Sequence, residues 1–231
     1  MQASALKVAN FGNESSLHSE VKAWIAEEGD RFEVLVDGFV VDIVRGDLLI
    51  EVQTRNFSAI REKLQSLVKN HNVRVVYPVA AEKMIVHVNE TDGKVVKRRA
   101  SPKKGKLIDL FDELVRIPRL VREKNFELMV LMTKEEEIRC NDGHGSWRRR
   151  GISIRDHSLK GVIDSYLFKN IDDYLRFLPE TMVQPFTSRQ LSEHFGISLR
   201  LARLMTYCLR EMGVLKIEGK NRRALLYKIS K

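Results

Sequence analysis

The sequence predicts an α/β fold: a mixed β-sheet with flanking helices, then a smaller α+β region, then a C-terminal unit of two helices and a hairpin. Three observations predict it. Two short apolar strands are joined at residues 46–47, a Gly-Asp pair typical of a two-residue hairpin loop. Helical apolar spacing over residues 57–70 precedes a β-branched run over 73–79. Residues 186–213 contain two capped helices ending in glycine, and a hairpin pattern follows over 214–229.

The first hairpin carries two acidic residues. A two-residue loop at 46–47 places Asp42 directly opposite Glu51. Like charges directly opposite each other destabilise a sheet. We therefore expect a cation between the two carboxylates, because hard divalent ions prefer oxygen ligands. Gln53, two residues beyond Glu51, projects from the same face of the strand.

With Glu20 on the helical segment 17–25, this pattern resembles the catalytic core of the PD-(D/E)xK phosphodiesterase superfamily, which includes restriction endonucleases and Holliday-junction resolvases. The resemblance covers roughly residues 14–80 and implies a restriction endonuclease-like sheet. It also implies that Glu20, Asp42 and Glu51 bind Mg²⁺, or Mn²⁺ as a substitute, and that the ion activates a water for hydrolysis of DNA.

The chain departs from the family pattern at one position. Gln53 stands where the family usually has lysine, although some restriction endonucleases of the family also carry glutamine there. The resemblance implies that Gln53 orients the attacking water or the phosphate. Lys22 on the first helix and Lys63 on the second are alternative sources of the missing ammonium group.

The C-terminal segment, residues 180–231, resembles a winged helix. Thr187 or Ser188 begins its first helix, and Ser198 begins a longer one that ends at Gly213. In that family the second helix enters the major groove of DNA and the hairpin contacts the backbone or minor groove. The residues expected to contact DNA are Arg200, Arg203, Lys220, Arg222 and Arg223.

The positive charge is concentrated in two segments. Residues 94–106 contain seven basic residues and no acidic ones, and residues 187–231 contain ten basic and three acidic residues. This clustering favours a polyanionic partner, namely duplex or branched DNA, although a lysine-rich segment can also be a solvated loop. Residues 147–150, a tryptophan followed by three arginines in a glycine-punctuated turn, suit phosphate contact or base stacking. Packing of this turn on a neighbouring domain is the alternative.

Three domains are expected: residues 1–104, a nuclease-like domain; 105–179, an α+β connecting region; and 180–231, the winged helix-turn-helix. The 84–99 segment predicts a hairpin that extends the first sheet. Within the connecting region we expect a helix over 107–116 and a strand over 126–132.

The composition indicates a cytoplasmic protein that associates with the nucleoid when bound to DNA. No apolar run approaches the length of a membrane span, and two cysteines are too few for a disulfide framework. The leading hypothesis is a metal-dependent DNA endonuclease. The alternatives are a non-catalytic DNA-binding regulator and an assembly component of a transposition or restriction system. Cutting both strands would require a homodimer or a partner nuclease or transposase.

Overall fold

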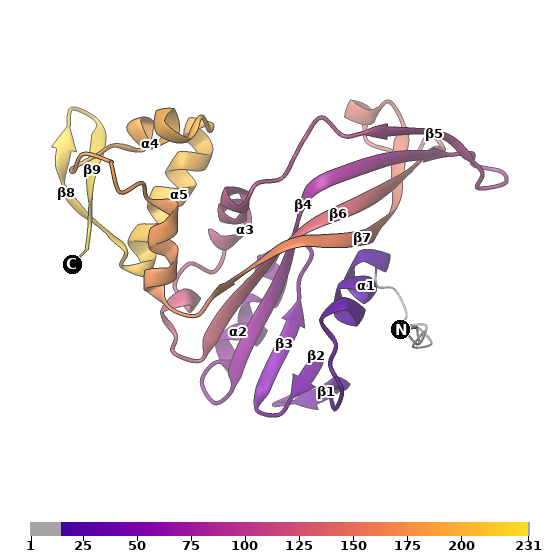
Figure 1. Ribbon diagram of the computed structural model, residues 1–231, viewed down its shortest axis with the longest axis horizontal. Coiled ribbons are helices and arrows are strands. Elements are labelled where there is room, and N and C mark those ends of the chain that lie inside the picture. Colours follow the sequence, from indigo (N-terminus) through magenta and orange to yellow (C-terminus); the bar gives the residue numbers. More distant parts are fainter. Residues whose placement is uncertain (1–14, 231) are drawn as a thin grey trace.

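The structure, a computed structural model, describes residues 15–230. Seven strands form one mixed sheet in the order β1-β2-β3-β4-β6-β7, with β5 paired to β4 outside this path (Figure 1). The strands are β1 (Arg31–Val36), β2 (Phe39–Arg45), β3 (Leu48–Val52), β4 (Asn72–Val88), β5 (Val95–Ala100), β6 (Phe126–Asn141) and β7 (Ile152–Phe168). The predicted α/β class with a mixed sheet and flanking helices is confirmed.

Helices cover both faces of this sheet. The helices that precede the C-terminal unit are α1 (Ser16–Ile25), α2 (Arg61–Leu67) and α3 (Phe111–Leu114), with short 3₁₀ helices η1 (Phe57–Ile60), η2 (Leu107–Leu110), η3 (Leu120–Arg122), η4 (Trp147–Arg149) and η5 (Ile171–Phe177), of which η4 lies in the β6–β7 connection and buries no residue. The C-terminal elements are α4 (Ser188–Phe195), α5 (Leu199–Met212), β8 (Leu215–Asn221) and β9 (Ala224–Ile229). No helix within residues 15–230 is long and apolar enough to cross a membrane.

The β2–β3 hairpin has the register predicted from its loop. Ile43 lies opposite Ile50, and Arg45 lies opposite Leu48. Gly46 has a φ of 53°, a conformation that the tight turn requires and that glycine adopts at little cost. The chain then crosses through η1 and α2 and returns as β4, parallel to β3, which is the strand, helix, strand order expected from the sequence.

β4 does not end near residue 79, where the predicted β-branched run ends, but continues through Pro78 to Val88. The β3–β4 ladder ends at the pairing of Val52 with Val76, with one further bond from the Gln53 amide to the Val76 carbonyl, 2.9 Å. The backbone groups of residue 78 face the same neighbouring strand as those of residue 76, namely β3. At residue 78, however, β3 has already ended. A proline there removes no ladder bond, and this explains why the strand tolerates it.

The far halves of the long strands form a projection that we call the arm. It comprises β5, residues 84–88 of β4, 134–141 of β6 and 152–160 of β7, and the connection 142–151; it extends to the upper right of Figure 1. β4 and β6 run parallel along its whole length, and β5 pairs antiparallel to β4 as predicted for the 84–99 hairpin. All six residues of β5 are exposed.

The sheet extends beyond the predicted boundary near residue 104. Residues 105–179, expected to form a separate α+β region, contribute β6 and β7 to the same sheet. The larger core, on the face opposite α1, continues from this sheet through Phe111 and Phe177 to Met205 and Leu209 of α5. The apolar cores of the sheet and the C-terminal helices are therefore continuous.

The local signals for the C-terminal helices are confirmed. The Thr187 side chain accepts a hydrogen bond from the Gln190 amide, and the Ser198 side chain accepts one from the Leu201 amide. Gly196, with a φ of 59°, ends α4 in the left-handed conformation that favours glycine. β8 and β9 pair antiparallel across a turn at residues 222–223, which completes an order of two helices and a hairpin.

Candidate functional site

Asp42 of β2 and Glu51 of β3 lie together at the open end of the hairpin. Ile43 pairs with Ile50, and Asp42 and Glu51 are the next residues along each strand. Both are buried, with 8% and 3% of their surface exposed. The Val52 amide donates to Asp42 Oδ2 at 2.8 Å, so the carboxylate also bonds the backbone of the neighbouring strand. The register predicted from the loop brings the two residues to the same end of the hairpin, where α1 contacts Asp42 and α2 contacts Glu51.

The two carboxyl groups have opposite pKa shifts. Burial, and then the charge of Asp42, raise the pKa of Glu51 to about 7, although Lys63 acts against this. Burial alone would raise the pKa of Asp42, but hydrogen bonds from His18 and the Val52 amide, with the charges of His18 and Lys22, hold it below its ordinary value. Near neutral pH, Asp42 is therefore ionised while Glu51 is close to its midpoint, as expected for two like charges in one buried site.

Helix α1 presents two basic side chains to Asp42. His18 Nε2 lies 2.8 Å from the Val52 carbonyl oxygen and 3.3 Å from Asp42 Oδ2. Lys22 Nζ lies 3.7 Å from Asp42 Oδ1 and also forms an ion pair with Glu33. His18 and Lys22 share one face of the helix because they are four residues apart. This i, i+4 pair was the available sequence signal for their joint contact with Asp42.

Glu20 does not join the pair, in contrast to the prediction. Its Oε2 accepts a hydrogen bond from the Leu159 amide of β7, and Ser16, one turn earlier, bonds Asp156 on the same strand. Two residues along a helix are rotated by about 200°, so the face that presents His18 to Asp42 turns Glu20 toward β7. The three-carboxylate arrangement implied by the resemblance is corrected to two carboxylates.

Gln53 is directed toward the loop that follows it. Its Nε2 donates to the carbonyl oxygens of Arg55 and of Asn56, the latter at 3.2 Å. These bonds hold the side-chain amide against the 54–56 backbone. The structure gives Gln53 a role in shaping this turn and does not bring it into contact with the two carboxylates.

Lys63 of α2 is the lysine that reaches Glu51. Its Nζ lies 2.5 Å from Glu51 Oε1 and also donates to the Val40 carbonyl. The side chain of Lys63 is 17% exposed, whereas that of Lys22 is 3% exposed. The structure thus brings both alternative lysines to the pair, one to each carboxylate, and Lys63 is the more accessible of the two.

Asp42 and Glu51 are donors that suit a hard divalent cation. Mg²⁺ in proteins is commonly held by one or two carboxylates, with waters and substrate phosphates in the remaining positions. Within residues 15–230 no group of three or more His, Cys, Asp or Glu side chains is arranged to hold a metal ion. If Asp42 and Glu51 held such an ion, water and phosphate would have to supply its remaining ligands.

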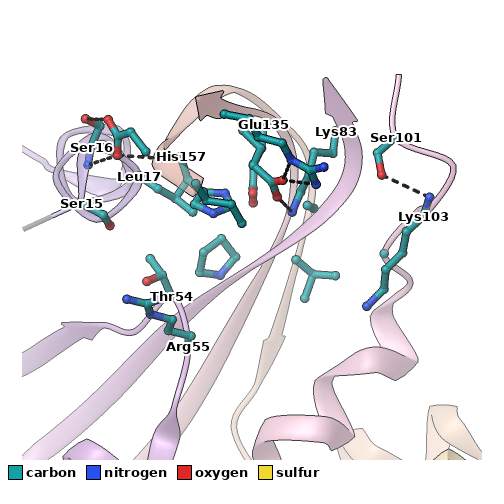
Figure 2. A pocket seen from close by; sticks show the side chains of 18 of the residues that line it. Ser15, Ser16, Leu17, Thr54, Arg55, Lys83, Ser101, Lys103, Glu135 and His157 are labelled. Atoms are coloured by element: carbon teal, nitrogen blue, oxygen red, sulfur yellow. Dashed lines mark hydrogen bonds and ion pairs between the residues drawn. The ribbon is translucent and has the colours of Figure 1, made fainter. Parts of the chain in front are cut away.

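A cleft of about 1350 Å³ is lined by neither Asp42 nor Glu51, but it includes residues next in sequence to His18 and Gln53. Leu17, which precedes His18, lines it together with Thr54 and Arg55, which follow Gln53. Figure 2 shows Thr54 and Arg55 facing the cleft from one side, with the start of α1 and the segment carrying Ser101 and Lys103 at other edges. The lysine and arginine residues in its lining are Arg55, Lys83, Lys103, Arg139, Arg149 and Arg155.

Several acidic residues of the cleft are engaged within the protein. Glu137 is paired with Lys83 at 3.3 Å and with Arg139 at 2.5 Å, and Asp112 binds Arg200 at 2.6 Å. Lys83 and Arg139 line the same cleft, so their pairs with Glu137 cancel positive and negative charge alike, whereas Arg200 compensates Asp112 from outside the lining.

The five residues expected to contact DNA differ in their surroundings. Arg200 at the start of α5 forms the ion pair with Asp112, near α3. Arg203, one turn later, is exposed. The remaining three lie at the tip of the β8–β9 hairpin and are all exposed: Lys220, Arg222 and Arg223. Arg200 is thus engaged with a residue of α3, while the other four form no ion pair within residues 15–230 and remain available at the surface.

Comparisons with other proteins match most of the chain. A family model described as "Domain of unknown function (DUF8091)" matches residues 15–169, which span α1 to β7. An uncharacterized protein of Treponema pallidum (strain Nichols) is 30% identical over 221 residues, covering 95% of this chain and 86% of that protein. No solved structure matches the chain. The matched region contains the whole sheet and both carboxylates.

Proposed function

This chain belongs to the DUF8091 family, and we propose that it is a metal-dependent DNA endonuclease whose active site is formed around Asp42 and Glu51. The observation that carries the proposal is the buried carboxylate pair on adjacent strands, with Lys63 bound to Glu51 at 2.5 Å. A buried like-charge pair is unfavourable for the fold alone. A buried pair whose two pKa values are shifted in opposite directions is therefore a candidate for cation binding and catalysis.

Each group around the pair has a role in this proposal. Asp42 and Glu51 would hold a magnesium or manganese ion, which would stabilise charge on the scissile phosphate and lower the pKa of a bound water. Glu51 must give up its proton before it can act as a ligand. Lys22 and His18 keep Asp42 ionised. Lys63, the more accessible lysine, would contact the phosphate or the attacking water, in the role that the family usually gives to the lysine replaced by Gln53.

The C-terminal unit would hold the DNA. We propose that α4, α5 and the β8–β9 hairpin act as a winged helix, with Arg203 on the second helix and Lys220, Arg222 and Arg223 on the hairpin. The exposed face of α5 continues along Tyr207, whose ring lies 5.4 Å from the Arg210 guanidinium carbon. A basic exposed helix face beside a basic hairpin tip suits a polyanionic duplex.

One observation favours a second candidate function. Lys22 and Lys63 already neutralise the two carboxylates, and Glu20 provides no third one. A protein with this site could bind DNA without cutting it, either as a regulator or as a component of a transposition or restriction assembly. The two candidates differ in a single property, which is turnover with a divalent metal.

Incubation of supercoiled plasmid with the full chain tests the proposed activity. We expect magnesium or manganese to convert the plasmid to nicked circles, and EDTA to prevent this. A single active site cuts one strand at a time, so nicks should precede linear product. Protein that binds the plasmid but leaves it supercoiled with either metal would support the non-catalytic function instead.

The hairpin tip should contribute to DNA affinity through its charges. In the full chain, the double substitution Arg222→Gln and Arg223→Gln is expected to weaken duplex binding in EDTA. It should also reduce the slope of log affinity against log salt by about one unit per lost phosphate contact. Fluorescence anisotropy over a salt series measures both quantities. Arg200→Gln is the matched control, because Arg200 is bound to Asp112, and its slope should stay close to that of the wild type. An unchanged slope in the double variant would exclude the hairpin as a phosphate contact.

A further inference from the structure

Two basic segments that lie far apart in the sequence meet on the arm. Lys97 of β5 is opposite His87 of β4, and His87 is opposite Arg139 of β6. Residues 142–151 connect β6 to β7 at this same end of the strands. Figure 1 shows β5 and this connection together at the upper right, away from the C-terminal unit. The charge of residues 94–99 and that of residues 148–150 therefore lie at the same end of the sheet.

Several cations on this surface lack acidic partners. Lys94 and Arg98 pair with Asp92 and Glu136. Four exposed residues form no ion pair with any part of the chain that the structure describes: Lys97, Arg99, Arg148 and Arg150. Burial and then the charges of Arg139, Arg99 and Lys97 lower the pKa of His87, as expected beside uncompensated positive charge.

Trp147 is presented at the surface by a closed loop. Its side chain is 83% exposed, and the Arg148 guanidinium carbon lies 5.6 Å from the centre of the ring. The Gly145 amide donates to the Gly151 carbonyl at 2.9 Å, which closes the loop. A Cβ at Gly145 would lie 1.9 Å from the Ile152 carbonyl oxygen, so only glycine permits this closure. The alternative that this turn packs on a neighbouring part of the chain does not hold for Trp147.

We propose that the arm binds an unpaired nucleobase of the substrate by stacking it on Trp147, while Lys97, Arg99, Arg148 and Arg150 contact the neighbouring phosphates. Stacking on an aromatic side chain tolerates any base because every base has a π-face. Base pairs inside a continuous duplex are already stacked on one another and offer no free face. The inference rests on the proposed function for DNA as the substrate. It refines the substrate to DNA that contains a flap, gap or other single-stranded segment.

The chain offers a direct optical test, because Trp24 and Trp147 are its only tryptophans. In the Trp24→Phe variant, Trp147 is the sole source of tryptophan fluorescence. We expect this fluorescence to be quenched, in EDTA, by a duplex with a single-stranded flap and by a single strand, but far less by a blunt continuous duplex. An unpaired base can come from DNA or from RNA, and quenching by a DNA strand and by an RNA strand of the same sequence distinguishes these two sources. Binding of the flapped duplex without quenching would overturn the proposal.

Affinity provides the second readout. Trp147→Ala should weaken binding of the flapped duplex about tenfold and change binding of the blunt duplex little, whereas Trp147→Phe should recover part of the loss. Trp24→Ala is the matched control, since Trp24 is an exposed tryptophan of α1 outside the arm. Equal losses for flapped and blunt duplexes would contradict recognition of an unpaired base. Both measurements are made without metal, so failure of DNA cleavage and failure of this inference remain distinguishable.

Discussion

Asp42→Asn and Glu51→Gln are each expected to lower the rate of metal-dependent plasmid nicking by at least about 100-fold. Substituting a residue that merely orients a metal ligand already lowers metal affinity or activity by about 10–100-fold. Each substitution removes one of the two carboxylates that would hold the ion. DNA affinity measured in EDTA should remain nearly that of the wild type, since neither substitution changes a residue proposed to contact DNA on the β8–β9 hairpin, on α5 or on the arm. Initial rates of nicking with magnesium, compared with anisotropy in EDTA, separate the two effects.

Glu20→Gln is the decisive control for this prediction. The sequence pattern makes Glu20 a third ligand, whereas the structure places its Oε2 on the Leu159 amide. Glutamine keeps an oxygen acceptor for that bond, so the Glu20→Gln variant should nick plasmid at about the wild-type rate. If Glu20→Gln abolished nicking while Asp42→Asn retained it, the assignment of the site to the β2–β3 hairpin would be wrong.

The free energy of unfolding should fall with rising pH in the wild type because of Glu51. Its pKa is about 7 in the folded protein and near 4.5 when unperturbed. The stability that the protonated form provides is complete below the unfolded value and is lost as the pH rises through the folded value. The difference between the two pKa values corresponds to a loss of roughly 3 kcal/mol in the free energy of unfolding by pH 8. Glu51→Gln cannot ionise and should lack this loss, which denaturant unfolding in EDTA at several pH values would show.

At pH 8, Asp42→Asn should lower the free energy of unfolding, whereas Glu51→Gln should raise it. Asp42 has a lowered pKa and is bound by Lys22, His18 and the Val52 amide. Its ionised form therefore stabilises the fold at every pH above its unfolded pKa. The substitution removes one of the carboxylates that compensate the charge of the buried Lys22, and breaking a buried charge pair is destabilising. Equal stabilisation by both substitutions would show that the two carboxyl groups are equivalent, which contradicts their opposite pKa shifts.

The features predicted from the sequence are those set by neighbouring residues. The two-residue loop at Gly46 fixes the hairpin register, and with it the position of Asp42 and Glu51 at one end of the hairpin. Capping residues fix the ends of α4 and α5 in the same local way. Each of these signals lies within a few residues of the structure that it determines, so no knowledge of the tertiary fold was needed.

The features that could not be predicted depend on distant contacts. The rotation of α1, which turns Glu20 away and His18 toward Asp42, is set by bonds to β7 about 140 residues later. Lys63 reaches Glu51 only because α2 packs beside the hairpin. The parallel pairing of β4 with β6, which builds the arm and carries the sheet past residue 104, has no local signal. The two carboxylates of the site could therefore be predicted from the sequence, whereas most of the residues that contact them could not.

The most direct test of a metal site at Asp42 and Glu51 is the effect of magnesium on unfolding at pH 8, where Glu51 is largely ionised. We expect magnesium to raise the melting temperature of the wild type by mass action on the folded state, and to raise neither that of Glu51→Gln nor that of Asp42→Asn. The increase should be smaller at pH 6, because protons compete with the ion for Glu51. A wild type whose melting temperature does not respond to magnesium or manganese, or variants that respond equally, would contradict the metal site.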